Sequence, residues 1–273
     1  MKIGNYDLKY YKLTHYKKII ARKFIKGVHT KPLFVVGNQR SGTTMLLSKL
    51  NRHFWVDIFH EDSSAMQDWE LKSFDEIDKL INGSKAKVCI MKPLEETHRI
   101  NELLDYFNGS KAIFMFRKYT DVINSSMRLA WGKHLKKYVQ NIDKGVDFKY
   151  SGALNLTTDN IKLIRDLYKD DLSDESCCAL IWYLRNSIYF EFQLYANPNI
   201  LLVQYESLVS NPKSEFKRIL TFMGLKWNNS IFYNISTKSI TKDPAVNIDV
   251  NIKVQCDNLL AKLEEHVKSC SVK

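Results

Sequence analysis

The sequence predicts a single α/β domain in three layers, with a central, mostly parallel β-sheet flanked by helices. Apolar runs with the length and composition of buried strands lie near residues 33–36, 55–59, 87–91, 112–116 and 200–204. Longer segments with helical periodicity separate these runs, and this alternation indicates crossover helices between parallel strands. No linker rich in Pro, Gly or Ser divides the 273 residues. We therefore expect one domain over residues 1–273.

The first apolar run leads into a loop with the features of a phosphate-binding loop. Gly37 and Gly42 have the spacing of the nucleotide P-loop, G-x-x-x-x-G-K-[ST], but Thr43 occupies the Lys position. The backbone amides of residues 38–44 can still surround an anion at the positive end of a following helix. Arg40 adds a planar cation that can hold phosphate or sulfonate oxygens. The loop therefore predicts anion binding, without the Lys on which NTP chemistry depends.

With its preceding strand, this loop resembles that of the sulfotransferases that use 3′-phosphoadenosine 5′-phosphosulfate (PAPS). The resemblance implies a P-loop-like sulfotransferase architecture, and it assigns the binding of PAPS to Gln39, Arg40, Ser41, Gly42, Thr43 and Thr44. A second match follows the run 112–116, where Arg117 and Ser125 stand eight residues apart. Family members bind the 3′-phosphate of the nucleotide with an Arg and a Ser at this spacing. The same role is implied for Arg117 and Ser125.

Further matches extend the resemblance over roughly residues 33–225. Lys92 ends the run 87–91, and the family often has a Lys here, close to the transferred sulfonate. At the carboxyl edge of a parallel strand, Lys92 faces the crevice where open α/β sheets bind ligands, and can stabilise charge on the bridging oxygen. The run 200–204 is followed by a Tyr-Glu-x-Leu turn that also resembles the family, and we count Tyr205 among the nucleotide-binding residues.

Sulfonate transfer also needs a base for the acceptor hydroxyl. Some relatives, including tyrosylprotein sulfotransferases, place a catalytic Glu just beyond the second strand, where His60 and Glu61 lie here. A carboxylate in a closed cleft can have its pKa raised enough to accept this proton. We expect Glu61 to be the base, with His60 as the alternative. An acidic residue at a helix N-terminus with no chemical role is the competing interpretation.

Two departures from the family pattern bear on the acceptor. Enzymes acting on small molecules follow the strand-end Lys with a nearby His, whereas residues 94–96 read Leu-Glu-Glu, and their C-terminal Arg-Lys-Gly motif is absent. Ser236, Lys238 and Lys242 are the candidates to approach the nucleotide in its place. These departures favour a saccharide or peptide hydroxyl over small phenols and steroids. Between these two classes we expect a carbohydrate or glycoconjugate, because it is the more frequent kind of acceptor and not because any residue indicates it. A tyrosyl peptide or a small molecule is the alternative.

No strand carries the apolar-run-then-Asp pattern of a Mg²⁺-holding Walker B. We therefore expect transfer without a metal, with adenosine 3′,5′-bisphosphate (PAP) as the nucleotide product. A P-loop kinase or NTPase, which would bind ATP with Mg²⁺, is the alternative from another enzyme class. A nucleotide binder that has lost transfer chemistry is the third possibility.

Composition narrows the partners and the compartment. The formal charge of +11 fits a polyanionic nucleotide, and without nucleic-acid motifs we expect no nucleic-acid partner. No apolar run approaches the ~18 residues of a membrane-spanning helix, and no signal-peptide pattern precedes the first strand. The five cysteines are odd in number and lack disulfide or metal spacing. These observations predict a cytoplasmic protein, while its oligomeric state stays open.

Two segments remain. Residues 10–26 are basic and amphipathic. This segment could make peripheral contact with an anionic membrane. We expect its Tyr, Ile and Phe side chains to pack on the core instead, which is the commoner case.

Within the core of about 31–225, residues 132–174 are polar, with little periodicity before Ile161. They form either an acceptor-side insertion or a solvated excursion with short helices. The C-terminal segment 226–273 follows the core.

Overall fold

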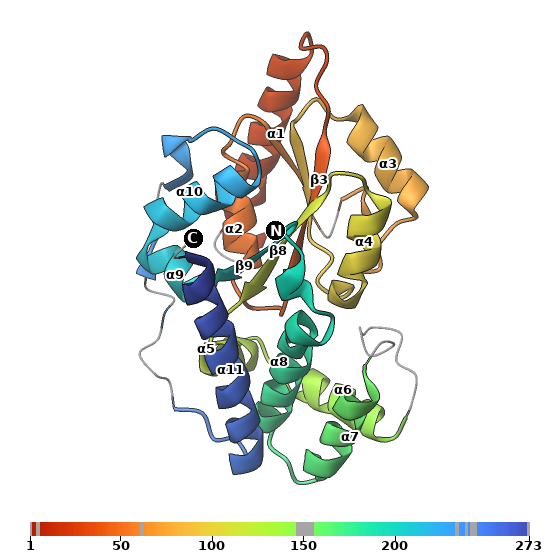
Figure 1. Cartoon of the computed structure of the whole chain (residues 1–273), viewed down its shortest axis with the longest axis vertical. Helices are drawn as coiled ribbons and strands as arrows, with labels where there is room; N and C mark the ends of the chain where they lie inside the picture. The colour runs from red at the N-terminus through yellow and green to blue at the C-terminus, as the bar shows by residue number, and fades with distance from the viewer. Residues whose placement is uncertain are drawn as a thin grey trace.

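The computed structural model describes residues 2–3, 6–60, 63–145, 156–232, 235–237, 240 and 245–271. A parallel sheet of five strands lies at its centre (Figure 1). The strands are β3 (Lys31–Gly37), β4 (Val56–Phe59), β7 (Val88–Met91), β8 (Lys111–Phe116) and β9 (Ile200–Gln204). Their order is β4-β7-β3-β8-β9, and all neighbours are parallel. Each strand coincides with a predicted apolar run, so the predicted sheet is confirmed.

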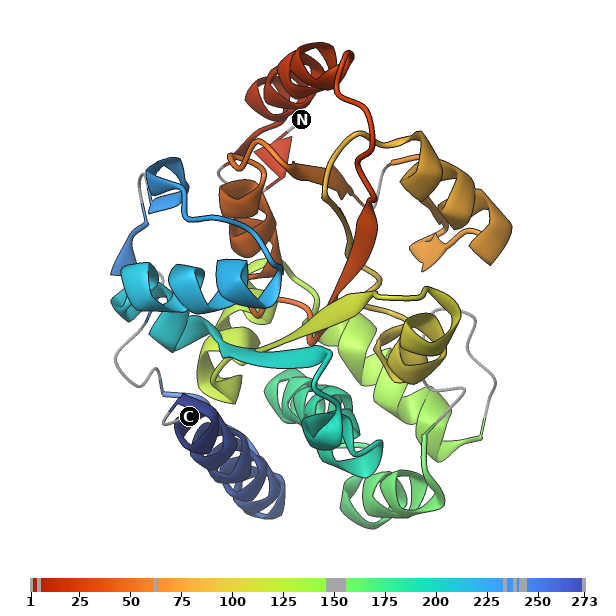
Figure 2. The same cartoon turned by 45° about the horizontal axis from the view of Figure 1, so that its top comes forward.

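Helices cover both faces of this sheet (Figures 1 and 2). One face carries α2 (Thr43–Leu50), α9 (Tyr205–Ser210) and α10 (Pro212–Phe222). The other carries α3 (Phe74–Gly83), α4 (Ile100–Tyr106), α5 (Tyr119–Arg128), α6 (Gly132–Asp143), α7 (Thr158–Leu167), α8 (Asp174–Glu191) and α11 (Val250–Ser271). Successive strand residues point to opposite faces, so Leu33 and Val35 pack in one core and Phe34 and Val36 in the other. The predicted three-layer architecture is confirmed.

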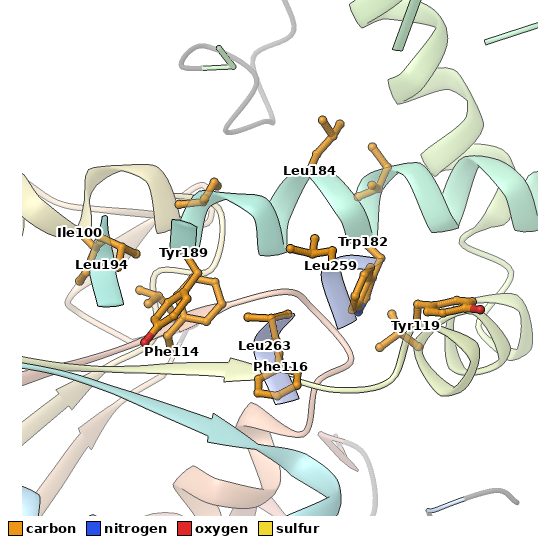
Figure 3. Packing of buried hydrophobic residues seen from close by; sticks show 14 of the residues in the cluster. Ile100, Phe114, Phe116, Tyr119, Trp182, Leu184, Tyr189, Leu194, Leu259 and Leu263 are labelled. Carbon is orange, nitrogen blue, oxygen red and sulfur yellow. The ribbon is translucent and has the colours of Figure 1, made fainter. Parts of the chain in front are cut away.

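The core beneath α8 and α11 is rich in aromatic side chains (Figure 3). The rings of Phe114 and Tyr189 lie 5.2 Å apart, and those of Tyr119 and Trp182 lie 5.6 Å apart in an edge-to-face contact. The Tyr119 hydroxyl donates a hydrogen bond of 2.7 Å to Asp257 Oδ1 on α11. Much of the C-terminal segment 226–273 is therefore a helix that completes this core.

The segment 132–174 contains two helices, α6 and α7, which pack against each other, and α6 also packs against α8. Tyr138, Val139 and Ile142 give α6 a buried apolar side. The expected lack of periodicity before Ile161 is therefore wrong for α6, whose short apolar face is masked in the sequence by its lysines. Residues 146–155 lie outside the described ranges.

The helix α1 (Leu8–Arg22) contradicts the expected packing of residues 10–26. Its buried side chains include Lys18 and Arg22, whereas Tyr16 and Ile20 are exposed. The cause lies on β4, where the Asp57 carboxylate is buried and pairs with Arg22 at 2.5 Å. A buried carboxylate requires a cationic partner, and this requirement sets the orientation of the helix.

The smaller elements are the hairpin strands β1 (Lys2–Ile3), β2 (Tyr6–Asp7), β5 (Met66–Gln67) and β6 (Glu70–Leu71), and the 3₁₀ turns η1 (Thr97–Arg99), η3 (Leu194–Ala196) and η4 (Asn229–Phe232). Among the helices of the described ranges, none combines the length and the apolar composition needed to cross a membrane.

Candidate active site

The loop between β3 and α2 has the backbone of a tight strand-to-helix turn. Gly37 has φ 116°, and a Cβ there would lie 2.2 Å from the Met115 carbonyl oxygen of the neighbouring strand. Gly42 caps α2 with φ 85°, and its Cβ would lie 2.1 Å from the Tyr205 ring. Both positions therefore require glycine. The turn leaves the amino end of α2 facing the carboxyl edge of the sheet, as an anion-binding loop requires.

Arg40 extends from this loop to α5. Its Nε donates a hydrogen bond of 3.0 Å to Ser125 Oγ, and its guanidinium lies 5.5 Å from the centre of the Trp131 ring. Burial lowers the pKa of Arg40, and the nearby charges of Arg117 and Arg128 lower it further. Three guanidinium groups thus raise the positive potential at one place, which favours a ligand with several negative charges.

Arg117 follows β8 and is nearly buried. It pairs with Asp121 at 3.3 Å, and its guanidinium lies 4.5 Å from the centre of the Tyr205 ring. The indole of Trp182 donates a hydrogen bond of 2.8 Å to the Arg117 carbonyl oxygen. The structure therefore brings Arg117 and Tyr205 to the loop, with Ser125 held by Arg40. The nucleotide-binding roles of these residues stay predictions.

Lys92 follows β7, beside the loop. It is buried, and its Nζ donates a hydrogen bond of 3.3 Å to Thr44 Oγ1. The register pairs Phe34 with Met91, so Lys92 leaves the sheet next to the central strand. Thr44 occupies the position whose hydroxyl holds Mg²⁺ in nucleotide P-loops. Here that hydroxyl accepts a hydrogen bond from an ammonium group.

The buried hydroxyl of Ser41 bears on whether the loop suits an oxyanion. Its side chain is fully buried, and within the described ranges its Oγ has no hydrogen-bond partner. Buried hydroxyls are normally satisfied, and an unmatched one inside a binding loop indicates a ligand oxygen. The loop and the guanidinium groups beside it therefore fit a phosphosulfate.

A cavity of about 590 Å³ opens from the loop. The predicted residues along its wall are Gln39, Arg40, Thr43, Thr44 and Lys92. The other lining residues are Trp69, Leu94, Glu95, Trp131, His134, Leu135, Tyr138, Ile181 and Arg185. The sequence does not predict this second set, although residues 94–96 depart from the family pattern. Three of these residues, His134, Leu135 and Tyr138, belong to α6 and so to the segment 132–174.

Glu95 organises the polar part of this wall. Its carboxylate accepts a hydrogen bond from Gln39 Nε2 and pairs with Arg185 of α8. Arg185 also donates a hydrogen bond of 3.0 Å to the Leu94 carbonyl oxygen. Three distant parts of the sequence are thereby fixed around the mouth of the loop. A ligand in the cavity meets charged donors and acceptors whose positions are already set.

Trp69 also lines the cavity, from the tip of the hairpin β5–β6. Asp68 has φ 51° and Trp69 φ 73°, the left-handed values of a type I′ turn. A bulky residue at positive φ is strained, and such strain collects at functional sites. The hairpin is tied to the segment after Lys92, because Leu71 N donates a hydrogen bond of 2.5 Å to Glu96 Oε2.

Two of the remaining predicted residues, His60 and Ser236, do not line the cavity. His60 is half-buried and follows β4, whose last residue, Phe59, pairs with Met91; it leaves the sheet beside Lys92 but does not line the cavity. Ser236 is exposed and is not brought to the cavity wall. Glu61, Lys238 and Lys242 lie outside the described residues.

The chain is similar to known sulfotransferases. The sulfotransferase domain family matches residues 30–272. The sulfotransferase domain from the curacin biosynthetic pathway superposes with a TM-score of 0.52 at 13% identity, over 87% of this chain and 99% of its own. The sulfotransferase domain of the Synechococcus PCC 7002 olefin synthase superposes with a TM-score of 0.48 at 14% identity, over 90% of this chain and 96% of its own. A mouse sulfotransferase complexed with PAP superposes with a TM-score of 0.39 at 14% identity, over 84% of this chain and 70% of its own. A search of curated proteins found no match.

The chain belongs to the sulfotransferase domain family. It is a transferase that moves a sulfonate group from PAPS to an acceptor hydroxyl.

Proposed function

We propose that the acceptor hydroxyl belongs to a carbohydrate or glycoconjugate. The observation that carries this proposal is the composition of the cavity, whose wall contains Lys92 together with two exposed tryptophans, Trp69 and Trp131. Aromatic faces can stack against the apolar face of a sugar ring, while Glu95 and Arg185 supply hydrogen-bonding groups for its hydroxyls. The volume of about 590 Å³ falls within the range of small-molecule sites.

On the donor side, we propose that the loop amides hold the 5′-phosphosulfate together with Arg40, Thr43 and Thr44. Gln39, Ser41 and Gly42 complete the loop. The 3′-phosphate is assigned to Arg117 and Ser125, with Tyr205 beside them. The hydrogen bond between Arg40 and Ser125 supports two adjacent phosphate subsites, because it joins a residue of each. Ser236 and Lys242 stay candidates for the far side of the 3′-phosphate.

The transfer forms a bond between the acceptor oxygen and sulfur and breaks the bond between sulfur and the bridging phosphate oxygen. Lys92 is proposed to stabilise the charge that develops on that bridging oxygen. The acceptor proton passes to a base, for which Glu61 is the first candidate and His60 the second. Lys92 donates a hydrogen bond to the Thr44 hydroxyl, which stands at the position that holds Mg²⁺ in nucleotide P-loops. A cationic side chain next to this hydroxyl supports transfer without Mg²⁺.

The acceptor class is tested by transfer of radiolabelled sulfonate from PAPS to a panel of saccharides, tyrosyl peptides and phenols. We expect the saccharides to be labelled. Trp69→Ala should raise the saccharide KM by roughly 2- to 10-fold, the value of one aromatic contact, and leave PAP binding unchanged. Trp227→Ala, which removes a partly exposed tryptophan outside the cavity, is the matched control. Labelling of peptides or phenols alone would overturn the acceptor assignment but not the donor site.

A further inference from the structure

The helix α1 turns its charged side chains inward and its apolar side chains outward. Lys18 and Arg22 are 6% and 0% exposed, whereas Leu13 is 52% and Ile20 54% exposed. Phe24, in the turn that follows the helix, is 86% exposed. Within the helix, positions 13, 16 and 20 have the spacing of one helical face. This apolar stripe, Leu13, Tyr16, Ile20 and Phe24, points away from the sheet.

Polar contacts fix this orientation. Lys18 Nζ donates hydrogen bonds of 2.9 Å to the Asn51 carbonyl oxygen and 2.5 Å to that of Val56. Arg22 pairs with Asp57, whose second carboxylate oxygen accepts a hydrogen bond of 2.8 Å from Ser84. Turning the apolar stripe inward would remove Arg22 from a buried carboxylate, which is strongly destabilising. The exposed stripe is therefore a stable feature of the fold.

Cations flank the apolar stripe. Lys17, Lys23 and Lys26 are exposed on the helix and the turn that follows it. No Asp or Glu occurs between Asp7 and Asp57 in the sequence. The surface thus combines exposed apolar side chains with exposed lysines, the combination of helices that lie at the interface of anionic bilayers.

We propose that α1 docks the protein on the surface of an anionic lipid bilayer, with the apolar stripe among the acyl chains and the lysines at the headgroups. A second copy of this chain is less suitable, because a two-fold interface would bring like charges together. Nucleic acid is also less suitable, because its charged phosphate backbone gives the apolar stripe nothing to pack against. In Figures 1 and 2, α1 lies at the opposite end of the molecule from α6 and α7, so docking leaves the cavity wall formed by α6 free.

The test is flotation of the protein with vesicles of phosphatidylcholine, with and without about 30% phosphatidylglycerol, in salt below physiological strength. We expect binding to the anionic vesicles alone. Ile20→Glu with Phe24→Glu should reduce the bound fraction by at least about tenfold, with unchanged thermal unfolding. The matched control is Val250→Glu with Val254→Glu, which places the same charges at exposed apolar positions of α11 and should bind as the native protein does.

A second pair of variants separates charge from apolar contact. Lys17→Glu with Lys23→Glu should abolish flotation, whereas Lys162→Glu with Lys169→Glu, an equal change of net charge on α7 and the segment after it, should weaken it only slightly. Failure of the native protein to bind anionic vesicles would overturn the proposal. Equal loss of vesicle binding in the two pairs of charge variants would overturn it as well. A dimer in gel filtration that only the α1 variants abolish would also overturn it, since a second copy of the chain would then cover the stripe. PAP binding should be unchanged in all four variants.

Discussion

Arg40 Nε donates a hydrogen bond of 3.0 Å to Ser125 Oγ, which joins the loop after β3 to the helix after β8. The two strands are neighbours in the sheet, so their carboxyl ends bring together groups that lie 85 residues apart in the sequence. We propose that Arg40 binds the 5′-phosphosulfate and that Ser125 binds the 3′-phosphate. The two subsites are therefore expected to be coupled, and variants on one side should be measured against both parts of the nucleotide.

Arg117 is expected to select for the 3′-phosphate. Arg117→Lys keeps a charge beside the buried Asp121 but loses the planar fork, so affinity for PAP should fall by about 10- to 100-fold, the value of a charge-assisted contact. Affinity for adenosine 5′-phosphate should change little. Calorimetry with both nucleotides measures the ratio, and Arg165→Lys on the exposed side of α7 is the control. Equal losses of affinity for the two nucleotides would contradict the assignment of the 3′-phosphate to Arg117.

Lys92 is expected to act on turnover more than on binding. Lys92→Met removes the ammonium but keeps much of the side-chain volume, so kcat should fall by roughly 10²- to 10³-fold while the Kd of PAP changes little. The native enzyme should retain full activity in a chelator. Steady-state kinetics with and without EDTA checks both points. A strict requirement for added Mg²⁺ would contradict the role given to Lys92 and Thr44.

Glu61 and His60 are distinguished by their separate removal. Glu61→Gln should leave PAP binding intact and lower kcat by about 10²- to 10⁴-fold, as loss of a general base does, while His60→Asn should have a small effect. Single-turnover assays with preloaded PAPS isolate this step. The opposite pattern would transfer the role to His60, and unchanged turnover in both variants would show that the base lies elsewhere.

His53 is expected to make stability fall in acid. Trp55 N donates a hydrogen bond of 3.2 Å to His53 Nδ1, so Nε2 carries the proton and donates to the Lys226 carbonyl oxygen at 3.0 Å. Burial lowers the pKa of His53 below its ordinary value of 6.5. The neutral ring therefore stabilises the fold fully above pH 6.5, and this contribution is lost as pH falls through the lowered pKa. Urea unfolding of the native protein and His53→Gln at pH 8 and pH 5.5 should show a smaller decline in the variant; equal declines would exclude His53 as the cause.

The sheet and the loop could be predicted from the sequence because their signals are local. A strand buried on both faces is a continuous apolar run, and Gly37, Arg40 and Gly42 lie within six residues of one another. The cavity wall could not be predicted in the same way. Glu95 and Arg185 are 90 residues apart, and no local pattern indicates that they pair. The face that α1 buries was also hidden, because it depends on Asp57, 35 residues beyond Arg22.

The most direct test of the account is calorimetric titration with PAP, and with ATP and Mg²⁺, of the native protein, Arg40→Ala and the control Arg165→Ala. We predict tight binding of PAP by the native protein and the control, no comparable binding of ATP, and loss of PAP affinity by at least about tenfold in Arg40→Ala. Preference for ATP with Mg²⁺, or PAP affinity that survives in Arg40→Ala, would contradict the assignment of the loop to the phosphosulfate donor.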